Sequence, residues 1–178
     1  MSMRQPKQDA TLEDILSLPD GVRAELIDGI RYDLAAPGRV HQQLLMNLSG
    51  AIFQHLQTHP GKCDVYPAPF AVFLNHDDRT YVEPDISVIC HPERLEEDGC
   101  HGAPDWIIEI VSPFSRQMDY LIKSNLYHTA GVRLYWIVDP QEKLVTVYCF
   151  EKGEITHFHF GESIPVDLDP SLILTVQL

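Results

Sequence analysis

DWIIEIV, residues 105–111, is the stretch of sequence that decides the fold. Successive side chains of a β-strand point to opposite faces, so Glu109 shares one face with Ile107 and Val111, while Trp106 and Ile108 share the other. Apolar residues on both faces are typical of a central strand that is covered on both sides. A carboxylate in such a strand is costly unless a cation, a metal or hydrogen-bond donors compensate it. Glu109 is therefore the first candidate for a functional residue.

A second carboxylate lies at the start of the preceding predicted strand. Pro84-Asp85 leads directly into the apolar run ISVI at 86–89. If this strand pairs with the strand at 105–111, Asp85 and Glu109 converge. Two neighbouring carboxylates repel each other unless a proton or a divalent ion lies between them. Oxygen ligands of this kind, with room for water, suit Mg²⁺ or Mn²⁺.

A lysine and a third carboxylate are candidates to join this pair. Asp119, Lys123 and Tyr127 lie at i, i+4 and i+8 of a predicted helix, where they form one stripe. One interpretation is that this stripe packs against the two carboxylates. The alternative is an ordinary surface pair of Asp119 and Lys123, worth a few tenths of a kcal/mol. Glu25, in a predicted hairpin that turns at Asp28-Gly29, could supply the third carboxylate.

The remaining pattern favours one α/β domain. We expect a tail at residues 1–10 and a single domain at 11–178, because one hydrophobic core serves roughly 100–200 residues. The predicted order of helices and strands indicates a mixed central β-sheet flanked by helices, with additional hairpins. The predicted helices span residues 11–18, 40–59 and 112–131, and the predicted strands span 63–74, 84–90, 105–111, 132–140, 143–151, 154–160 and 171–178; a polar loop is expected at 91–104.

Composition excludes several classes of protein. The 178 residues carry 13 Lys and Arg against 26 Asp and Glu, a formal net charge of −13. This charge argues against a non-specific nucleic-acid coat protein, which needs clustered cations to neutralise phosphates. No apolar run approaches the roughly 18 residues that span a bilayer. The N-terminal sequence lacks the apolar stretch of a signal peptide, so we expect a cytoplasmic protein with no membrane partner.

Four cysteines occur without a CxxC pair. Cys90-His91 and Cys100-His101 form two Cys-His dipeptides ten residues apart, and zinc can take two sulfurs and two imidazoles. Adjacent residues of an extended chain point in opposite directions, however, and the usual spacing of zinc ligands is absent. The favoured interpretation is ordinary thiols in a reducing compartment.

Pro84-Asp85 followed by Glu109-Ile110-Val111 resembles the signature of the PD-(D/E)xK, or restriction-endonuclease-like, nuclease superfamily. The chain is more closely similar to the Uma-type restriction endonuclease family over roughly residues 11–150. The motifs that carry this resemblance are ELIDG (25–29), EPDISV (83–88), IEIVSPFSR (108–116), Asp119, Lys123, Tyr127, Gly131-Val132 and YWIVDP (135–140).

The resemblance implies a site as well as a fold. The superfamily usually carries its lysine two residues after the glutamate, where this chain has Val111. In the Uma-type family the lysine has in effect moved to the following helix, and Lys123 matches that position. The implied catalytic residues are Asp85, Glu109, Lys123 and Glu25. The implied Mg²⁺ or Mn²⁺ ligands are Asp85, Glu109, the carbonyl of Ile110 and Glu25. His41, Arg116 and Tyr127 are candidates to lie near the substrate; the favoured alternatives are a solvated histidine at the start of a helix for His41 and a packing role for Tyr127.

Three functional hypotheses follow. The first is a homodimeric, metal-dependent endonuclease that hydrolyses DNA phosphodiester bonds with a metal-activated water. The second is a catalytically idle module of the nuclease fold that binds protein or nucleic acid. The third is a structural ion pair that compensates buried Glu109, with an arginine such as Arg31 or Arg133 as its partner.

Overall fold

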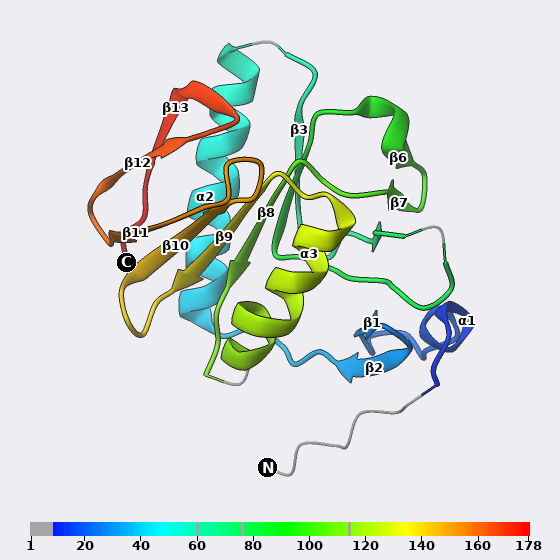
Figure 1. Cartoon of the computed structure of the whole chain (residues 1–178). Coiled ribbons are helices and arrows are strands. Elements are labelled where there is room, and N and C mark those ends of the chain that lie inside the picture. Colours follow the sequence, from blue (N-terminus) through cyan, green and yellow to red (C-terminus); the bar gives the residue numbers. More distant parts are fainter. Residues whose placement is uncertain (1–8, 60, 76, 114) are drawn as a thin grey trace.

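The computed structural model describes residues 9–59, 61–75, 77–113 and 115–178 (Figure 1). A six-stranded sheet forms its centre, in the order β11-β10-β9-β8-β5-β3. β8 and β9 are parallel and every other neighbouring pair is antiparallel, so the predicted mixed sheet is confirmed. The bounds are β3 Asp64–Pro67, β5 Ile86–Ile89, β8 Trp106–Ile110, β9 Leu134–Asp139, β10 Leu144–Cys149 and β11 Glu154–His159.

The interior strands of this sheet are buried on both faces. All five residues of β8 and all six of β9 are buried. Trp106, Ile108 and Ile110 face one hydrophobic core, and Ile107 belongs to the other. The alternation expected for the central strand is therefore present, and it turns Glu109 toward the face that carries Ile107.

Helices cover the two faces of the sheet (Figure 1). α2, Arg39–Thr58, packs on the first core through Leu44, Leu45, Leu48 and Ile52, which recur at helical spacing. The opposite face is covered by a continuous helical segment, the π-helical η2, Met118–Lys123, followed by α3, Ser124–Ala130. Gly131 ends this segment with φ 92°, the left-handed conformation that favours glycine after a helix.

Smaller units surround the sheet. α1, Leu12–Leu16, lies beside the hairpin of β1, Ala24–Ile27, and β2, Ile30–Asp33. Asp28 and Gly29 turn that hairpin with φ values of 51° and 77°, as the Asp-Gly dipeptide predicted. The other units are the β12–β13 pair, Ser163–Val166 and Asp169–Thr175, and a small sheet of β4 Val72–Phe73, β6 Leu95–Glu96 and β7 Gly99–His101, with the 3₁₀ turn η1 at Pro92–Arg94.

Three local predictions need correction. The strand predicted at 63–74 is two strands, because the prolines at 67 and 69 interrupt hydrogen bonding and β3 lies at the edge of the sheet. The loop predicted at 91–104 contains β6 and β7, which are too short to give a periodic signal. β12 was not predicted at all, since its alternation covers only four residues.

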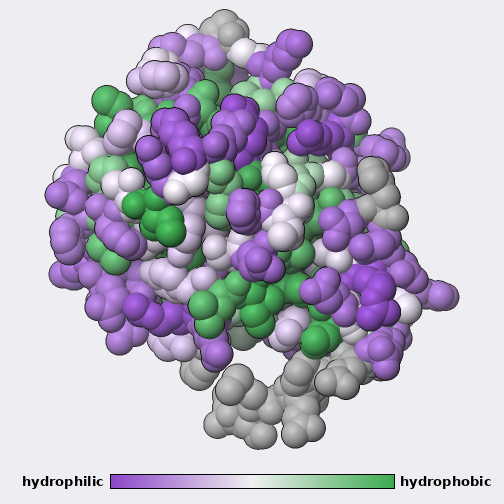
Figure 2. All heavy atoms as spheres, in the orientation of Figure 1, coloured by the Kyte–Doolittle hydropathy of each residue, from purple (hydrophilic) through white to green (hydrophobic). Residues whose placement is uncertain are grey.

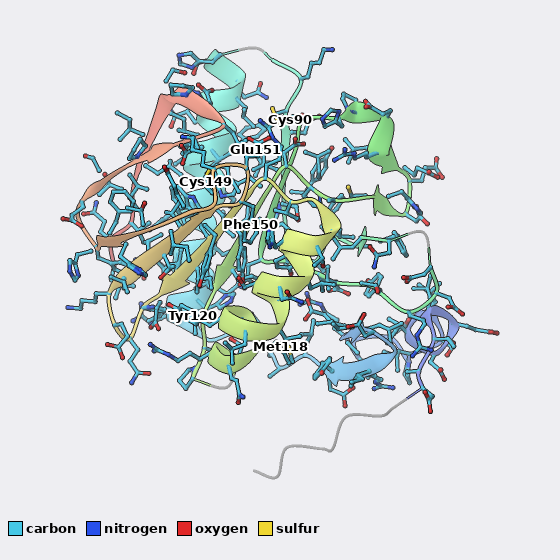
Figure 3. All side chains as sticks on the ribbon, in the orientation of Figure 1. Cys90, Met118, Tyr120, Cys149, Phe150 and Glu151 are labelled. Carbon is cyan, nitrogen blue, oxygen red and sulfur yellow. A yellow bond between two sulfur atoms is a disulfide. The ribbon has the colours of Figure 1, made fainter. Side chains whose placement is uncertain are left out.

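The cysteines also differ from the prediction. Cys63 and Cys90 form a disulfide, whereas Cys100 and Cys149 are buried free thiols. Asp64 pairs with Ile89 across β3 and β5, so Cys63 and Cys90 occupy the next opposed positions. Their separation of 27 residues gave no sequence signal. Cys90 follows the C-terminal end of β5, whereas Asp85 precedes the N-terminal end of the same strand. Figure 3 shows Cys90 at the opposite end of the sheet from Met118 and Tyr120 of the helical segment η2.

The N-terminal residues 1–8 of the predicted tail lie outside the described residues. Ala10 is fully buried and its N–H donates to the carbonyl of Gly29 at 2.8 Å, so the packed structure includes this residue. Within the described parts of the chain, no helix is long and apolar enough to cross a membrane.

Adjacent residues of α2 provide a test of the packing. Ile52 is 1% exposed against the sheet, whereas Phe53 is 55% exposed. We expect Ile52→Ala to lower the free energy of unfolding by about 2–5 kcal/mol, because it removes a buried side chain and leaves a cavity. Phe53→Ala is the matched control on the same helix and should stay within about 0.5 kcal/mol. Urea unfolding measures both; equal losses would contradict the packing of α2.

Candidate active site

Asp85 and Glu109 meet at the end of two neighbouring strands. Ile86 of β5 pairs with Ile108 of β8, so the next antiparallel positions place Asp85 opposite Glu109. The Ile110 N–H donates to Asp85 Oδ2 at 2.7 Å. The Asp85 N–H lies 3.4 Å from Glu109 Oε2. The predicted convergence of these two carboxylates is therefore present in the structure.

Lys123 links two carboxylates from different parts of the chain. Its Nζ donates to Glu109 Oε1 at 2.9 Å and to Glu25 Oε1 at 2.8 Å. The same Glu25 oxygen accepts the N–H of Glu83 at 3.0 Å. Glu25, Glu109 and Lys123 are at most 5% exposed, so this is a buried ion pair with hydrogen bonds on both partners. Glu109 is not paired with Arg31 or Arg133, which contact Asp33, Glu151 and Asp105 instead.

The π-helical turn explains how the whole stripe faces inward. In an α-helix, a step of four residues overshoots one turn by about 40°. A π-helical turn contains more residues, so a step of four across η2 falls short of a full turn. The two deviations offset each other between Asp119, Lys123 and Tyr127, all of which are buried. Leu121 and Ile122 point outward, and Figure 2 shows apolar side chains gathered on this face over η2.

Tyr127 completes the environment of Glu109. Its hydroxyl donates to Glu109 Oε1 at 2.7 Å, and its side chain is fully buried. Burial, together with the nearby carboxylate, raises the pKa of Tyr127 well above its ordinary value, so its hydroxyl remains a donor. Tyr127 was a candidate to lie near the substrate, with packing as the favoured alternative. The structure places it in the core against Glu109, where it holds one carboxylate oxygen.

The site carries more negative than positive charge. Burial raises the pKa of Glu109 well above its ordinary value; Lys123 opposes this shift, while Asp85, Asp119 and Glu25 add to it. Burial lowers the pKa of Lys123, but the carboxylates of Glu109 and Glu25 outweigh that effect and raise it overall. The lysine is therefore held in its charged form. The carboxylates are the groups that need further compensation.

Asp119 is a fourth carboxylate of the site, and its burial was not predictable from the sequence. It is 3% exposed, so it does not form the ordinary surface pair with Lys123 that was the alternative interpretation. Burial raises its pKa to about 6, against the lowering effects of Lys123 and a hydrogen bond from Ser115. The i, i+4, i+8 spacing was the available signal, but spacing alone does not distinguish a buried stripe from an exposed one.

The two remaining predicted residues, His41 and Arg116, lie at the rim of the site, where side chains are partly exposed to solvent. His41, in the first turn of α2, places Nε2 3.0 Å from Asp85 Oδ2, and both side chains are 17% exposed. Arg116 places Nη1 2.6 Å from Asp139 Oδ2 and its guanidinium 5.5 Å from the ring centre of Tyr120. Arg116 therefore ties the segment before η2 to the end of β9, and 45% of its side chain remains exposed.

A separate group of possible metal ligands lies on the small sheet. This group consists of Glu96, Asp98 and His101, whose ligand atoms all lie within 4.8 Å of one another. Among the described residues, no other group of at least three acidic, histidine or cysteine residues meets this criterion. His101 Nε2 donates to Asp98 Oδ1 at 2.9 Å, and both acids are exposed. The Cys-His zinc arrangement is absent, because Cys90 is bonded to Cys63.

Comparisons with known proteins identify the family. Residues 12–177 match the Uma2 family model, described as "Putative restriction endonuclease". The chain belongs to this family. Its structure is similar to that of a putative nuclease of the DUF820 family from Anabaena variabilis, with a TM-score of 0.75 and 25% identity over 93% of this chain and 94% of that one. Family membership supports a nuclease-like function and confirms the restriction-endonuclease-like fold.

One curated relative also matches. Uncharacterized protein slr1290 from Synechocystis is 24% identical over 125 residues, which are 70% of this chain. The match spans 64% of the relative's length.

The pKa of Asp119 gives a pH-dependence that can be measured. An aspartate with a raised folded-state pKa stabilises the fold at low pH, and that contribution is lost as pH rises from about 4 through about 6. We expect Asp119→Asn to remove this loss, so its stability relative to wild type should rise by on the order of 2 kcal/mol across that range. Urea unfolding in EDTA between pH 4 and 7 measures the difference.

Asp20→Asn, in the exposed turn after α1, is the control and should follow the wild-type curve. Parallel curves for wild type and Asp119→Asn would show that Asp119 titrates in the folded protein as it does in the unfolded chain.

Proposed function

We propose that this protein is a metal-dependent endonuclease that hydrolyses DNA phosphodiester bonds. The observation that carries the proposal is the pair of carboxylates at Asp85 and Glu109, side by side at neighbouring strand ends, with the Lys123 ammonium 2.9 Å from Glu109. Membership of a family of restriction-endonuclease type supports the same chemistry. This combination supports DNA as the substrate.

The donor chemistry fits Mg²⁺ or Mn²⁺. Asp85 and Glu109 offer the hard carboxylate oxygens that these ions prefer. Each carboxylate has one oxygen that is strongly hydrogen-bonded and one that is available: no described residue donates to Asp85 Oδ1, and Glu109 Oε2 accepts only the 3.4 Å contact. We assign the Ile110 carbonyl as a further ligand. Glu25 would act from the far side of Lys123 as an outer ligand, through the oxygen that Lys123 does not contact.

Electrostatics supports the same assignment. Glu25, Glu109 and Asp119 act on the Lys123 ammonium, and Asp85 adds a fourth carboxylate beside Glu109. The raised pKa of Glu109 reflects burial and this excess of negative charge. A divalent cation beside Asp85 and Glu109 would offset the excess and favour the ionised form of both ligands.

The chain's own residues have distinct roles in this proposal. A bound divalent ion would supply Lewis-acid polarisation of the phosphate and a water of lowered pKa. Lys123, kept protonated by Glu109 and Glu25, would donate hydrogen bonds and stabilise negative charge that develops on the phosphate. Tyr127 would hold Glu109 in place through its 2.7 Å hydrogen bond.

The substrate would approach from the rim rather than through the buried side of the site. Asp85 and His41 are each 17% exposed, while Lys123 and Glu109 lie behind them. Arg116 lies on the segment that leads into η2 and keeps nearly half of its side chain exposed, so we assign it to a phosphate of the DNA backbone. We further propose a homodimer, because two-fold symmetry would present one site to each strand of a duplex; sedimentation velocity measures its mass.

Cleavage of supercoiled and linear DNA tests the proposal. We expect nicking that requires Mg²⁺ or Mn²⁺, stops in EDTA, and falls at least about 100-fold in Glu109→Gln and Lys123→Met, which remove electrostatic groups at the reacting phosphate. Gel electrophoresis of timed samples measures the rates. Glu96→Gln is the matched control, because it removes a carboxylate from the second group of possible ligands and should leave cleavage unchanged.

If Glu109→Gln and Lys123→Met still cleave DNA at the wild-type rate, the activity does not come from this site. No cleavage by folded wild-type protein with either ion would favour the alternative of a catalytically idle module.

A further inference from the structure

His41 contacts Asp85 but has no role in the proposed hydrolysis described above. It lies in the first turn of α2, on the opposite face of the sheet from Lys123 and Tyr127. Its Nε2 nevertheless reaches Asp85 Oδ2, at 3.0 Å, around the end of β5. Asp85 is therefore contacted from two layers of the fold: by α2 through His41, and by the neighbouring strand β8 through the Ile110 N–H.

The direction of the His41 hydrogen bond follows from its partner. An ionised aspartate only accepts hydrogen bonds, so Nε2 carries the proton and donates it. Nδ1 is buried and has no hydrogen-bond partner among the described residues. Neither ring nitrogen is therefore free to meet a phosphate: one is occupied by Asp85 and the other is shielded from solvent.

The two donors bind the same oxygen of Asp85 and leave the other oxygen without a donor in the described part of the chain. Oδ2 accepts both His41 Nε2–H and the Ile110 N–H, at 3.0 and 2.7 Å. Oδ1 accepts no hydrogen bond from a described residue. Glu109 is arranged in the same way, since Oε1 accepts Lys123 and Tyr127 while Oε2 lies toward Asp85. Each carboxylate thus has one oxygen fixed by two strong donors and a second oxygen left for another ligand.

We propose that His41 is a positioning residue, which fixes the Asp85 carboxylate so that Oδ1 is presented to the divalent ion. This inference rests on the proposed function, because it assumes a cation site at Asp85 and Glu109. Carboxylates that bind metals are commonly oriented by hydrogen bonds of this kind, and loss of such a partner typically lowers metal affinity 10- to 100-fold. His41 thereby connects α2 to the site without touching the substrate.

Mn²⁺ affinity provides the direct test. The concentration of free Mn²⁺ is measured by its electron paramagnetic resonance signal during titration of wild type and each variant, without DNA. We expect His41→Phe, which keeps a ring but loses the donor, to bind Mn²⁺ about 10- to 100-fold more weakly than wild type. His41→Gln can place an amide N–H near the position of Nε2, so it should restore most of the affinity. His41→Asn, whose amide is one carbon shorter, should not.

His59→Phe is the matched control, because it makes the same substitution at the exposed C-terminal cap of the same helix. It should bind Mn²⁺ as wild type does. Thermal unfolding of each variant shows whether it is folded. If His41→Phe does not fold, the comparison of His41→Gln with His41→Asn still decides the role of the donor.

Kinetics separates positioning from substrate contact. A positioning role predicts that saturating Mn²⁺ returns much of the activity of His41→Phe while KM for DNA stays near the wild-type value. Unchanged Mn²⁺ affinity in His41→Phe, equal losses in the Gln and Asn variants, or a rise in KM for DNA alone would each overturn the inference. If wild type and Glu109→Gln bind Mn²⁺ equally, the proposed metal site itself fails, and the role of His41 fails with it.

Discussion

The Lys123 ammonium between Glu25 and Glu109 is the interaction on which the site depends. Each partner comes from a different unit: the β1–β2 hairpin, the central strand β8 and the helical segment that covers it. Removal of one partner of a buried ion pair leaves an uncompensated charge, which costs about 3–5 kcal/mol. The contact therefore fixes the relative positions of three units, and it orients Glu109 at the same time.

The central part of the fold follows from local sequence patterns. The alternation in residues 105–111 predicted a strand covered on both faces, and β8 is that strand. Local signals also predicted the Asp28-Gly29 turn, α2 and the helix end at Gly131. Each of these features depends on the backbone preference or the apolar periodicity of consecutive residues. The disulfide does not, because its formation depends on the register of β3 against β5.

The site was only partly predictable for a related reason. Sequence placed Asp85 and Glu109 on strands that could pair, and antiparallel register brought them together. It did not decide whether Asp119 and Lys123 were exposed, since an i, i+4 spacing is common to buried and surface stripes. Nor did it indicate the contact from His41 to Asp85, which joins α2 to the start of β5 across 44 residues of sequence.

The π-helical turn of η2 has a consequence for how this site can vary. The lysine arrives on a helix rather than on the strand that carries Glu109, so its angular position is set by helical winding. Loss of one residue within the turn would rotate Lys123 and Tyr127 by about 100° relative to Asp119. The backbone of β8 and the carboxylates of Asp85 and Glu109 would be untouched by such a change. In this fold, the loss of a single residue from the helix is therefore enough to turn the Lys123 ammonium out of the site.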